Sequence, residues 1–142
     1  MADKYLGESI KNLGFGLMRL PMLGEEIDIE QVKRMVDTFM SKGFTYFDTA
    51  YVYIGGKSEV ALKEAVVDRY PRDSFQCATK LPLWDQKSIE ELEAIFQESL
   101  DRAGLEYYDF YLLHAMSAER EKKADELGAW DFMKRLKAEG KA

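Results

Sequence analysis

The sequence is poor in the residues that build cross-linked, metal-bound or membrane-inserted proteins. Its 142 residues include one cysteine (Cys77) and one histidine (His114). A single cysteine excludes a disulfide framework or a cysteine metal cage within one chain, so we expect no metal site. No apolar run approaches the ~20 residues of a membrane-spanning helix, and the start MADKYLGES contains no apolar targeting segment. We therefore expect a cytoplasmic protein that makes no use of a membrane.

The sequence also lacks an excess of positive charge. It has 20 Lys and Arg against 26 Asp and Glu, which gives a formal net charge of −6. The basic residues are dispersed along the chain and form no stripe that could follow a phosphate backbone, so we expect no nucleic-acid partner. The remaining composition, 46% hydrophobic and 32% charged, is that of one globular domain with a real core.

Short apolar stretches alternate with longer segments in which apolar residues recur at helical spacing. This alternation predicts four strands, each followed by a helix. The strands are expected over residues 13–18, 45–50, 75–80 and 107–114. Asp28 and Ser88 have the positions of helix N-caps, and Gly43, Gly104 and Gly140 have the positions of helix ends.

The strand ends recur at an almost constant interval. Gly16 and Asp48 are 32 residues apart, Asp48 and Lys80 are 32 apart, and Lys80 and His114 are 34 apart. Strands joined by helical crossovers of one hand are parallel, and their carboxyl ends meet at one rim. Residues 14–19 read GFGLMR and lack the G-x-G-x-x-G turn of doubly wound dinucleotide-binding folds. We therefore predict an α/β fold of the (β/α) TIM-barrel type, present here as four βα units, a half barrel.

Four polar residues would come together at this rim: Asp48, Tyr53, Lys80 and His114. They supply a carboxylate, a phenol, an ammonium and an imidazole, a set suited to protonating a carbonyl oxygen. A phenol with its ordinary pKa of about 10 is a weak acid, and an ammonium within about 4–6 Å makes its proton easier to deliver. Lys80 is the candidate ammonium, and the carboxylate of Asp48 would keep it charged. His114 would orient the carbonyl through a hydrogen bond.

Each of these residues also has a structural interpretation. Tyr53 alone could be packing surface, Asp48 could cap a turn, Lys80 could be a solvated strand end, and His114 could be a satisfied core histidine. Their joint placement at matched strand ends favours the catalytic interpretation. Asp109 begins its strand at the opposite rim, and we predict a structural role for it.

Apolar residues in the rim loops are candidates for the wall of a pocket for an organic substrate. Core packing is at least as good an explanation for each of them. They are Tyr51, Ile54, Leu83 and Trp84.

These motifs resemble the aldo-keto reductase superfamily. The resemblance rests on FDTAYVY (47–53), GGKSE (55–59), ATK (78–80) and YYDFYLLH (107–114), and LGFGLMRLP (13–21) is most similar to a bacterial branch in which some members carry a C-terminal ferredoxin-like segment. The resemblance implies a (β/α)8 barrel closed at its bottom by an N-terminal hairpin, here about Lys4 to Lys11. It also implies NADPH as the hydride donor and a small aldehyde or ketone as the substrate.

The resemblance assigns a role to each rim residue. It implies that Tyr53 is the general acid, that Lys80 and Asp48 assist it, and that His114 binds the carbonyl. It further implies that Asp48, Met18 and Arg19 could touch the nicotinamide ribose of the cofactor.

The length of the chain departs from the family pattern. A barrel of this class takes about 250 residues, so residues 1–142 correspond to the N-terminal half of one. In the family, the groups that hold the cofactor phosphates come from later strands, and we expect this chain alone to bind NADPH poorly and to show little activity. Its open sheet edges could also pair two copies into a homodimer. The alternative function is a noncatalytic half barrel used for binding or assembly.

Overall fold

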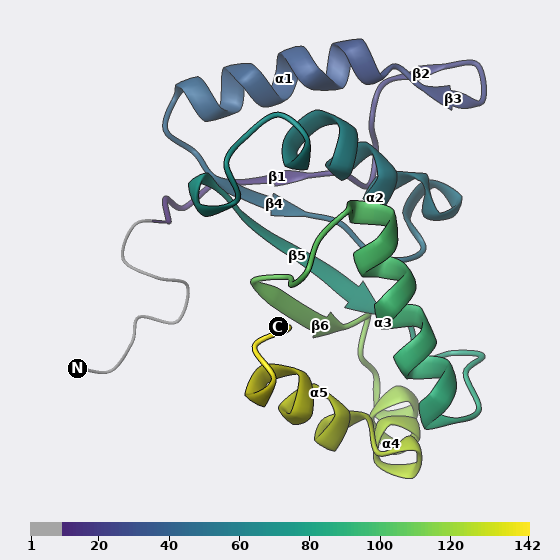
Figure 1. Cartoon of the computed structure of the whole chain (residues 1–142). Coiled ribbons are helices and arrows are strands. Elements are labelled where there is room, and N and C mark those ends of the chain that lie inside the picture. The colour runs from purple at the N-terminus through teal and green to yellow at the C-terminus, as the bar shows by residue number, and fades with distance from the viewer. Residues whose placement is uncertain (1–9) are drawn as a thin grey trace.

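The computed structural model describes residues 10–142, which form a four-stranded parallel sheet with helices around it (Figure 1). The strands lie in the order β1 (Gly14–Gly16), β4 (Tyr46–Asp48), β5 (Gln76–Leu81) and β6 (Phe110–Leu113). All three pairings are parallel, and the register aligns Gly16 with Asp48 and Lys80 with Leu112. The expected parallel α/β fold is confirmed. The hairpin expected over residues 4–11 lies almost entirely outside the described residues.

The helices begin and end largely where the capping residues predict. Helix α1 (Ile29–Ser41) begins after Asp28, whose side chain accepts a hydrogen bond from the Gln31 amide. Helix α3 (Ile89–Ala103) begins in the same way after Ser88 and ends at Gly104, which has φ 65°. A left-handed residue is favourable there because glycine has no Cβ to clash.

The remaining helices depart from the simple pattern. Helix α2 (Lys57–Leu62) continues as a wider π-helical turn over Lys63–Val67, in which the Asp68 amide donates to the Lys63 carbonyl at 2.9 Å. The fourth unit has two helices, α4 (Ala118–Leu127) and α5 (Ala129–Ala138), where we expected one. Gly128, with φ 71°, separates them because a left-handed residue ends a helix.

A short antiparallel hairpin follows β1 and was not predicted. Its strands are β2 (Met22–Leu23) and β3 (Glu26–Ile27), joined by a turn in which Gly24 has φ 63°. Strands of two residues are too short to produce a periodic apolar pattern, so periodicity could not reveal them.

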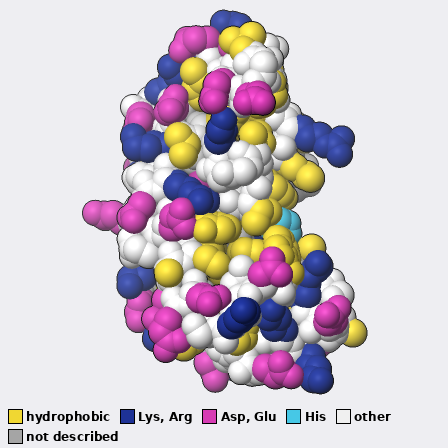
Figure 2. All heavy atoms as spheres, turned by 90° about the vertical axis from the view of Figure 1, so that its right-hand side faces the viewer, with side chains coloured by type: hydrophobic (Ala, Val, Ile, Leu, Met, Phe, Trp, Pro, Cys, Tyr) yellow, Lys and Arg dark blue, Asp and Glu magenta, His cyan; other side chains and the backbone are white. Residues whose placement is uncertain are grey.

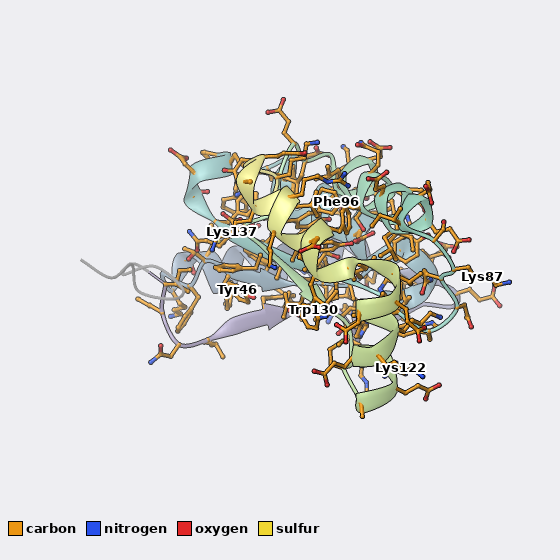
Figure 3. The ribbon with its side chains drawn as sticks, turned by 90° about the horizontal axis from the view of Figure 1, so that it is seen from below. Tyr46, Lys87, Phe96, Lys122, Trp130 and Lys137 are labelled. Carbon is orange, nitrogen blue, oxygen red and sulfur yellow. The ribbon has the colours of Figure 1, made fainter. Side chains whose placement is uncertain are left out.

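Side chains alternate between the two faces of the sheet. Phe15, Phe47 and Cys77 point to the face that the helices cover, and Phe47 and Cys77 are fully buried. Figure 1 shows α1, α2 and α3 around that face and α4 and α5 beside β6. In the view from below, Phe96 of α3 lies against α5 (Figure 3), where its ring centroid is 6.3 Å from that of Phe132. The core therefore lies between the sheet and the helices.

The other face of the sheet carries the residues that matter for the site. Asp48, Lys80 and Leu112 share this face, and Leu112 is 40% exposed. Residues 10–142 leave the sheet open, with β1 and β6 as its edges. No helix in this range is long and apolar enough to cross a bilayer.

Asp109 lies at the opposite rim, as expected, just before β6. Its carboxylate accepts hydrogen bonds from the Cys77 amide at 2.8 Å and from Arg72 at 2.7 Å. It joins two strands to the loop before β5, which is a structural role.

Candidate active site

The structure brings Asp48, Tyr53, Lys80 and His114 together at the carboxyl ends of the strands. Asp48 ends β4, Lys80 is the next-to-last residue of β5, and His114 directly follows β6. The His114 amide donates to the Leu81 carbonyl at 2.9 Å, which extends the β5–β6 pairing by one residue. Tyr53 opens a short turn after β4, and its amide donates to the Ala50 carbonyl at 3.1 Å.

Lys80 is the centre of the hydrogen-bonded group. Its ammonium donates to the Asp48 carboxylate at 2.6 Å, to the Thr49 carbonyl at 2.7 Å and to the Tyr53 hydroxyl at 3.2 Å. The Lys80 side chain is 14% exposed and that of Asp48 is 32% exposed, so the ion pair is only partly screened by water.

These three bonds determine what the Tyr53 hydroxyl can do. An ammonium has three protons to donate, and Lys80 has one acceptor for each of them. Because the Tyr53 oxygen accepts from Lys80, its own proton remains available for another acceptor. The arrangement therefore leaves a phenolic proton that can be donated to a bound molecule.

His114 borders this group on the β6 side. Its ring centroid is 5.6 Å from that of Tyr53, with the two rings nearly perpendicular. Burial lowers the pKa of His114, and the positive charges of Lys80 and Arg120 lower it further, while Asp48 opposes them. The imidazole is therefore neutral near pH 7 and can still donate one hydrogen bond.

Of the apolar rim residues, Trp84 packs against His114. Its ring centroid is 5.4 Å from that of His114, and its side chain is 37% exposed. Leu83 is fully buried and belongs to the core. Figure 2 shows hydrophobic side chains gathered in the middle of this end of the molecule, with the histidine at their edge. An exposed apolar surface beside polar groups is typical of an organic-ligand site.

Polar contacts hold the loop that carries Tyr53 to the rest of the fold. The hydroxyl of Ser58 lies 2.7 Å from that of Thr49 and donates to the Leu17 carbonyl at 2.8 Å. Glu59 is fully buried and accepts a hydrogen bond from Thr79 at 2.6 Å. Arg102 of α3 lies 3.3 Å from the same carboxylate.

Sequence reasoning missed the connection between Glu59 and Arg102. A glutamate directly after a predicted helix start gives no sign that it will be fully buried.

The two remaining cofactor candidates lie in the loop after β1. Met18 is 54% exposed and Arg19 is also exposed. With Asp48, they offer a guanidinium, a thioether and a carboxylate. This set fits an amide and ribose hydroxyls, but one cation is too few for the several negative charges of a dinucleotide phosphate. Within residues 10–142, no group of three His, Cys, Asp or Glu side chains could hold a metal ion.

A parallel sheet with outer crossover helices and polar groups at the carboxyl ends of its strands defines a protein of the (β/α)-barrel class. Comparison with known proteins places it more closely. Residues 12–142 match the Aldo/keto reductase family, and the chain belongs to that family.

Two mycobacterial relatives give the extent of the similarity. An aldo-keto reductase of Mycobacterium tuberculosis is 33% identical over 127 residues, which cover 87% of this chain and 43% of the relative. One from Mycolicibacterium smegmatis is 31% identical over 125 residues, which cover 85% of this chain and 42% of the relative. The chain thus spans less than half the length of the curated relatives it matches.

Solved structures have the same fold. An aldo-keto reductase from Klebsiella pneumoniae in complex with NADPH aligns with a TM-score of 0.69 and 23% identity, over 93% of this chain and 43% of that chain. A structure of an aldo/keto reductase from the same organism with NADP and acetate aligns with a TM-score of 0.70 and 24% identity, over 93% and 43% of the two chains. The described residues therefore form an open part of the TIM-barrel fold.

Proposed function

We propose that this chain carries the proton-donating site of an NADPH-dependent reductase of aldehydes or ketones. One observation carries the proposal: the Lys80 ammonium binds both Asp48 and the Tyr53 hydroxyl, and the His114 ring lies 5.6 Å from the Tyr53 ring, centroid to centroid. Membership of the aldo/keto reductase family and the NADPH-bound neighbour support it. As a unit, residues 1–142 correspond to the N-terminal half of such a barrel.

In this proposal the substrate carbonyl oxygen accepts hydrogen bonds from Tyr53 and His114. Bound NADPH supplies a hydride to the carbonyl carbon. As the C=O π bond breaks, its electron pair moves to the oxygen, which takes the phenolic proton of Tyr53. Lys80 stabilises the phenolate that remains, and Asp48 keeps Lys80 charged. His114 shares the negative charge on the oxygen during the reaction.

The cofactor contacts proposed within this chain are few. Asp48, Met18 and Arg19 would contact the nicotinamide end of the cofactor, at its ribose and at the carboxamide of the ring. The phosphates need further cations, so we expect the 142-residue chain alone to bind NADPH weakly.

A noncatalytic assembly module is the second candidate. The observation that favours it is the open sheet, whose uncovered face includes the 40% exposed Leu112. In this case the rim residues would be inherited from a reductase and would have no catalytic role.

The experiment that separates the two candidates uses the coding sequence expressed to its own stop codon. NADPH oxidation is followed at its characteristic absorbance with a panel of aldehydes and ketones. A reductase oxidises NADPH in proportion to the added carbonyl compound, and the Tyr53→Phe variant loses this turnover. An assembly module shows no carbonyl-dependent oxidation, and Tyr53→Phe leaves its self-association unchanged.

A further inference from the structure

Arg102 touches none of the four site residues, yet it contacts the loop that carries Tyr53 on both sides of that residue. On one side, its guanidinium donates to the Tyr51 carbonyl at 3.0 Å and lies 4.3 Å from the centre of the Tyr51 ring. On the other side, it lies under Gly56. A Cβ added at Gly56 would be 2.9 Å from the guanidinium carbon of Arg102. Arg102 thus contacts residues 51–56 at both ends of the segment.

Two carboxylates hold the guanidinium in this place. Arg102 donates to Glu98 at 2.7 Å and to the fully buried Glu59 at 3.3 Å. Burial lowers the pKa of Arg102, but the charges of Glu98 and Glu59 outweigh that effect and raise the pKa. Glu98 also accepts a hydrogen bond from the Tyr51 hydroxyl at 2.7 Å, so it clamps both partners of the contact.

The loop needs such support because its backbone is unusual. Ile54 has φ 51°, Gly55 has φ 60° and Gly56 has φ 89°. The left-handed region is costly for a β-branched residue such as isoleucine, and such a conformation persists only when its surroundings hold it. Tyr53 directly precedes these three residues. A loop that relaxed toward ordinary backbone angles would turn Tyr53 away from its present direction.

We propose that Arg102 is a positioning residue, which holds residues 51–56 from α3 and thereby keeps the Tyr53 hydroxyl within hydrogen-bonding distance of Lys80. The inference rests on the proposed function for its catalytic meaning, but the positioning itself can be measured without turnover. Arg102 is not a catalytic residue, because it touches neither Tyr53 nor Lys80.

The test uses 19F NMR of the purified chain labelled with 3-fluorotyrosine. The sequence has 8 tyrosines, and the Tyr53→Phe variant identifies the Tyr53 signal by its loss. The measured quantity is the change in the 19F chemical shift of Tyr53 that Lys80→Met causes. A large change means that the Lys80 ammonium lies close to the Tyr53 ring, and we call this change the coupling of Tyr53 to Lys80. In the Arg102→Leu background we expect this change to be smaller by about threefold or more.

Arg72→Leu is the matched control. Arg72 has a side-chain exposure of 25% against 22% for Arg102, and it too forms an ion pair and lies over a tyrosine ring. Arg72 lies at the other end of the sheet, where it binds Asp109. Its loss should lower the free energy of unfolding in urea, yet leave the coupling of Tyr53 to Lys80 intact.

A milder variant covers the case in which Arg102→Leu does not fold. Glu98→Gln weakens the clamp at a side chain that is 49% exposed, and it should reduce the same coupling to a smaller extent. If Lys80→Met changes the Tyr53 chemical shift equally in the native chain and in the folded Arg102→Leu or Glu98→Gln variant, the inference about Arg102 is overturned. If Lys80→Met leaves the Tyr53 chemical shift unchanged in the native chain, the result would instead contradict the site geometry of the proposed function.

Discussion

At the scale of single residues, the charges of the site and the burial of His114 together determine whether its imidazole is protonated. His114 is the only histidine in the sequence. Burial lowers its pKa first of all, and Lys80 and Arg120 add to this effect against the opposing Asp48. The fold therefore holds His114 in its neutral form, in which one ring nitrogen carries a proton and can donate a hydrogen bond.

This depressed pKa predicts a pH dependence of stability. In the unfolded chain His114 titrates near its ordinary pKa of about 6.5, whereas in the fold it titrates lower. Below about pH 6.5 the unfolded chain binds the extra proton, so the free energy of unfolding falls as the pH drops from 7 toward 5. Urea unfolding across this range measures the effect. In His114→Gln the decrease should be shallower, and equal slopes in the two proteins would contradict the assignment.

The sequence predicts the side chains that meet at the rim better than it predicts the residues packed behind them. Asp48, Lys80 and His114 follow from the spacing of the strand ends, because parallel strands bring their carboxyl ends to one rim. Arg102 and Glu59 could not be found in this way. Their contact depends on how α2 and α3 pack against each other, and side chains that pack between elements leave no local period in the sequence.

At the scale of elements, the loop over residues 51–56 connects the strand that provides Asp48 to the helix that buries Glu59. Its three consecutive left-handed residues turn the chain sharply between β4 and α2. The two glycines of GGKSE account for two of these positions, because glycine adopts positive φ without strain. Ile54 is the exception: its positive φ is strained for a β-branched residue, and the contacts of the surrounding loop must stabilise it.

Gly56→Ala tests the contact between this loop and α3. The substitution adds a Cβ at φ 89° and places it 2.9 Å from the guanidinium carbon of Arg102. We expect the free energy of unfolding to fall by about 2 kcal/mol or more. Circular dichroism during urea unfolding measures the change.

Gly24→Ala is the control that isolates the backbone strain. Gly24 has φ 63°, but an added Cβ there meets no atom within 4 Å. Its cost should be about 1 kcal/mol. Equal costs at the two positions would show that the contact between Gly56 and Arg102 is loose.

The sequence predicts a helix boundary correctly where a residue and its partner a few positions away determine it. The helix starts at Asp28 and Ser88 follow from caps whose partners are three residues away. The break at Gly128 was missed because the segment before it is strongly polar, with one buried side chain, Ala124, in α4. Helix α4 therefore has little apolar periodicity of its own.

At the scale of the whole molecule, the sheet has an open face and two open edges within residues 10–142. Parallel sheets are normally covered on both faces. Tyr46 and Phe110 meet on the open face with their ring centroids 5.7 Å apart, and Leu112 lies on the same face. An apolar face of this kind favours association with a further part of a barrel or with a second copy of the chain.

We predict that the purified 142-residue chain forms a homodimer through this face and the edges of the sheet. Unpaired edge strands recruit partners, and closed two-fold symmetry is the commonest outcome for identical chains. Sedimentation velocity at micromolar concentration should show a dimer. Leu112→Glu places a charge on the open face and should shift the population toward monomer. A native chain that sediments as a monomer would contradict this prediction.

In the proposed reaction, Tyr53 gives its proton to the carbonyl oxygen of the substrate. The most direct measurement is single-turnover hydride transfer from prebound NADPH, in the protein expressed to its stop codon and in its Tyr53→Phe variant. Because general acid catalysis contributes about 10²–10⁴-fold, we predict that the rate falls by at least about 100-fold while NADPH affinity changes little. A rate in Tyr53→Phe that stays close to that of the unmodified protein would contradict the account.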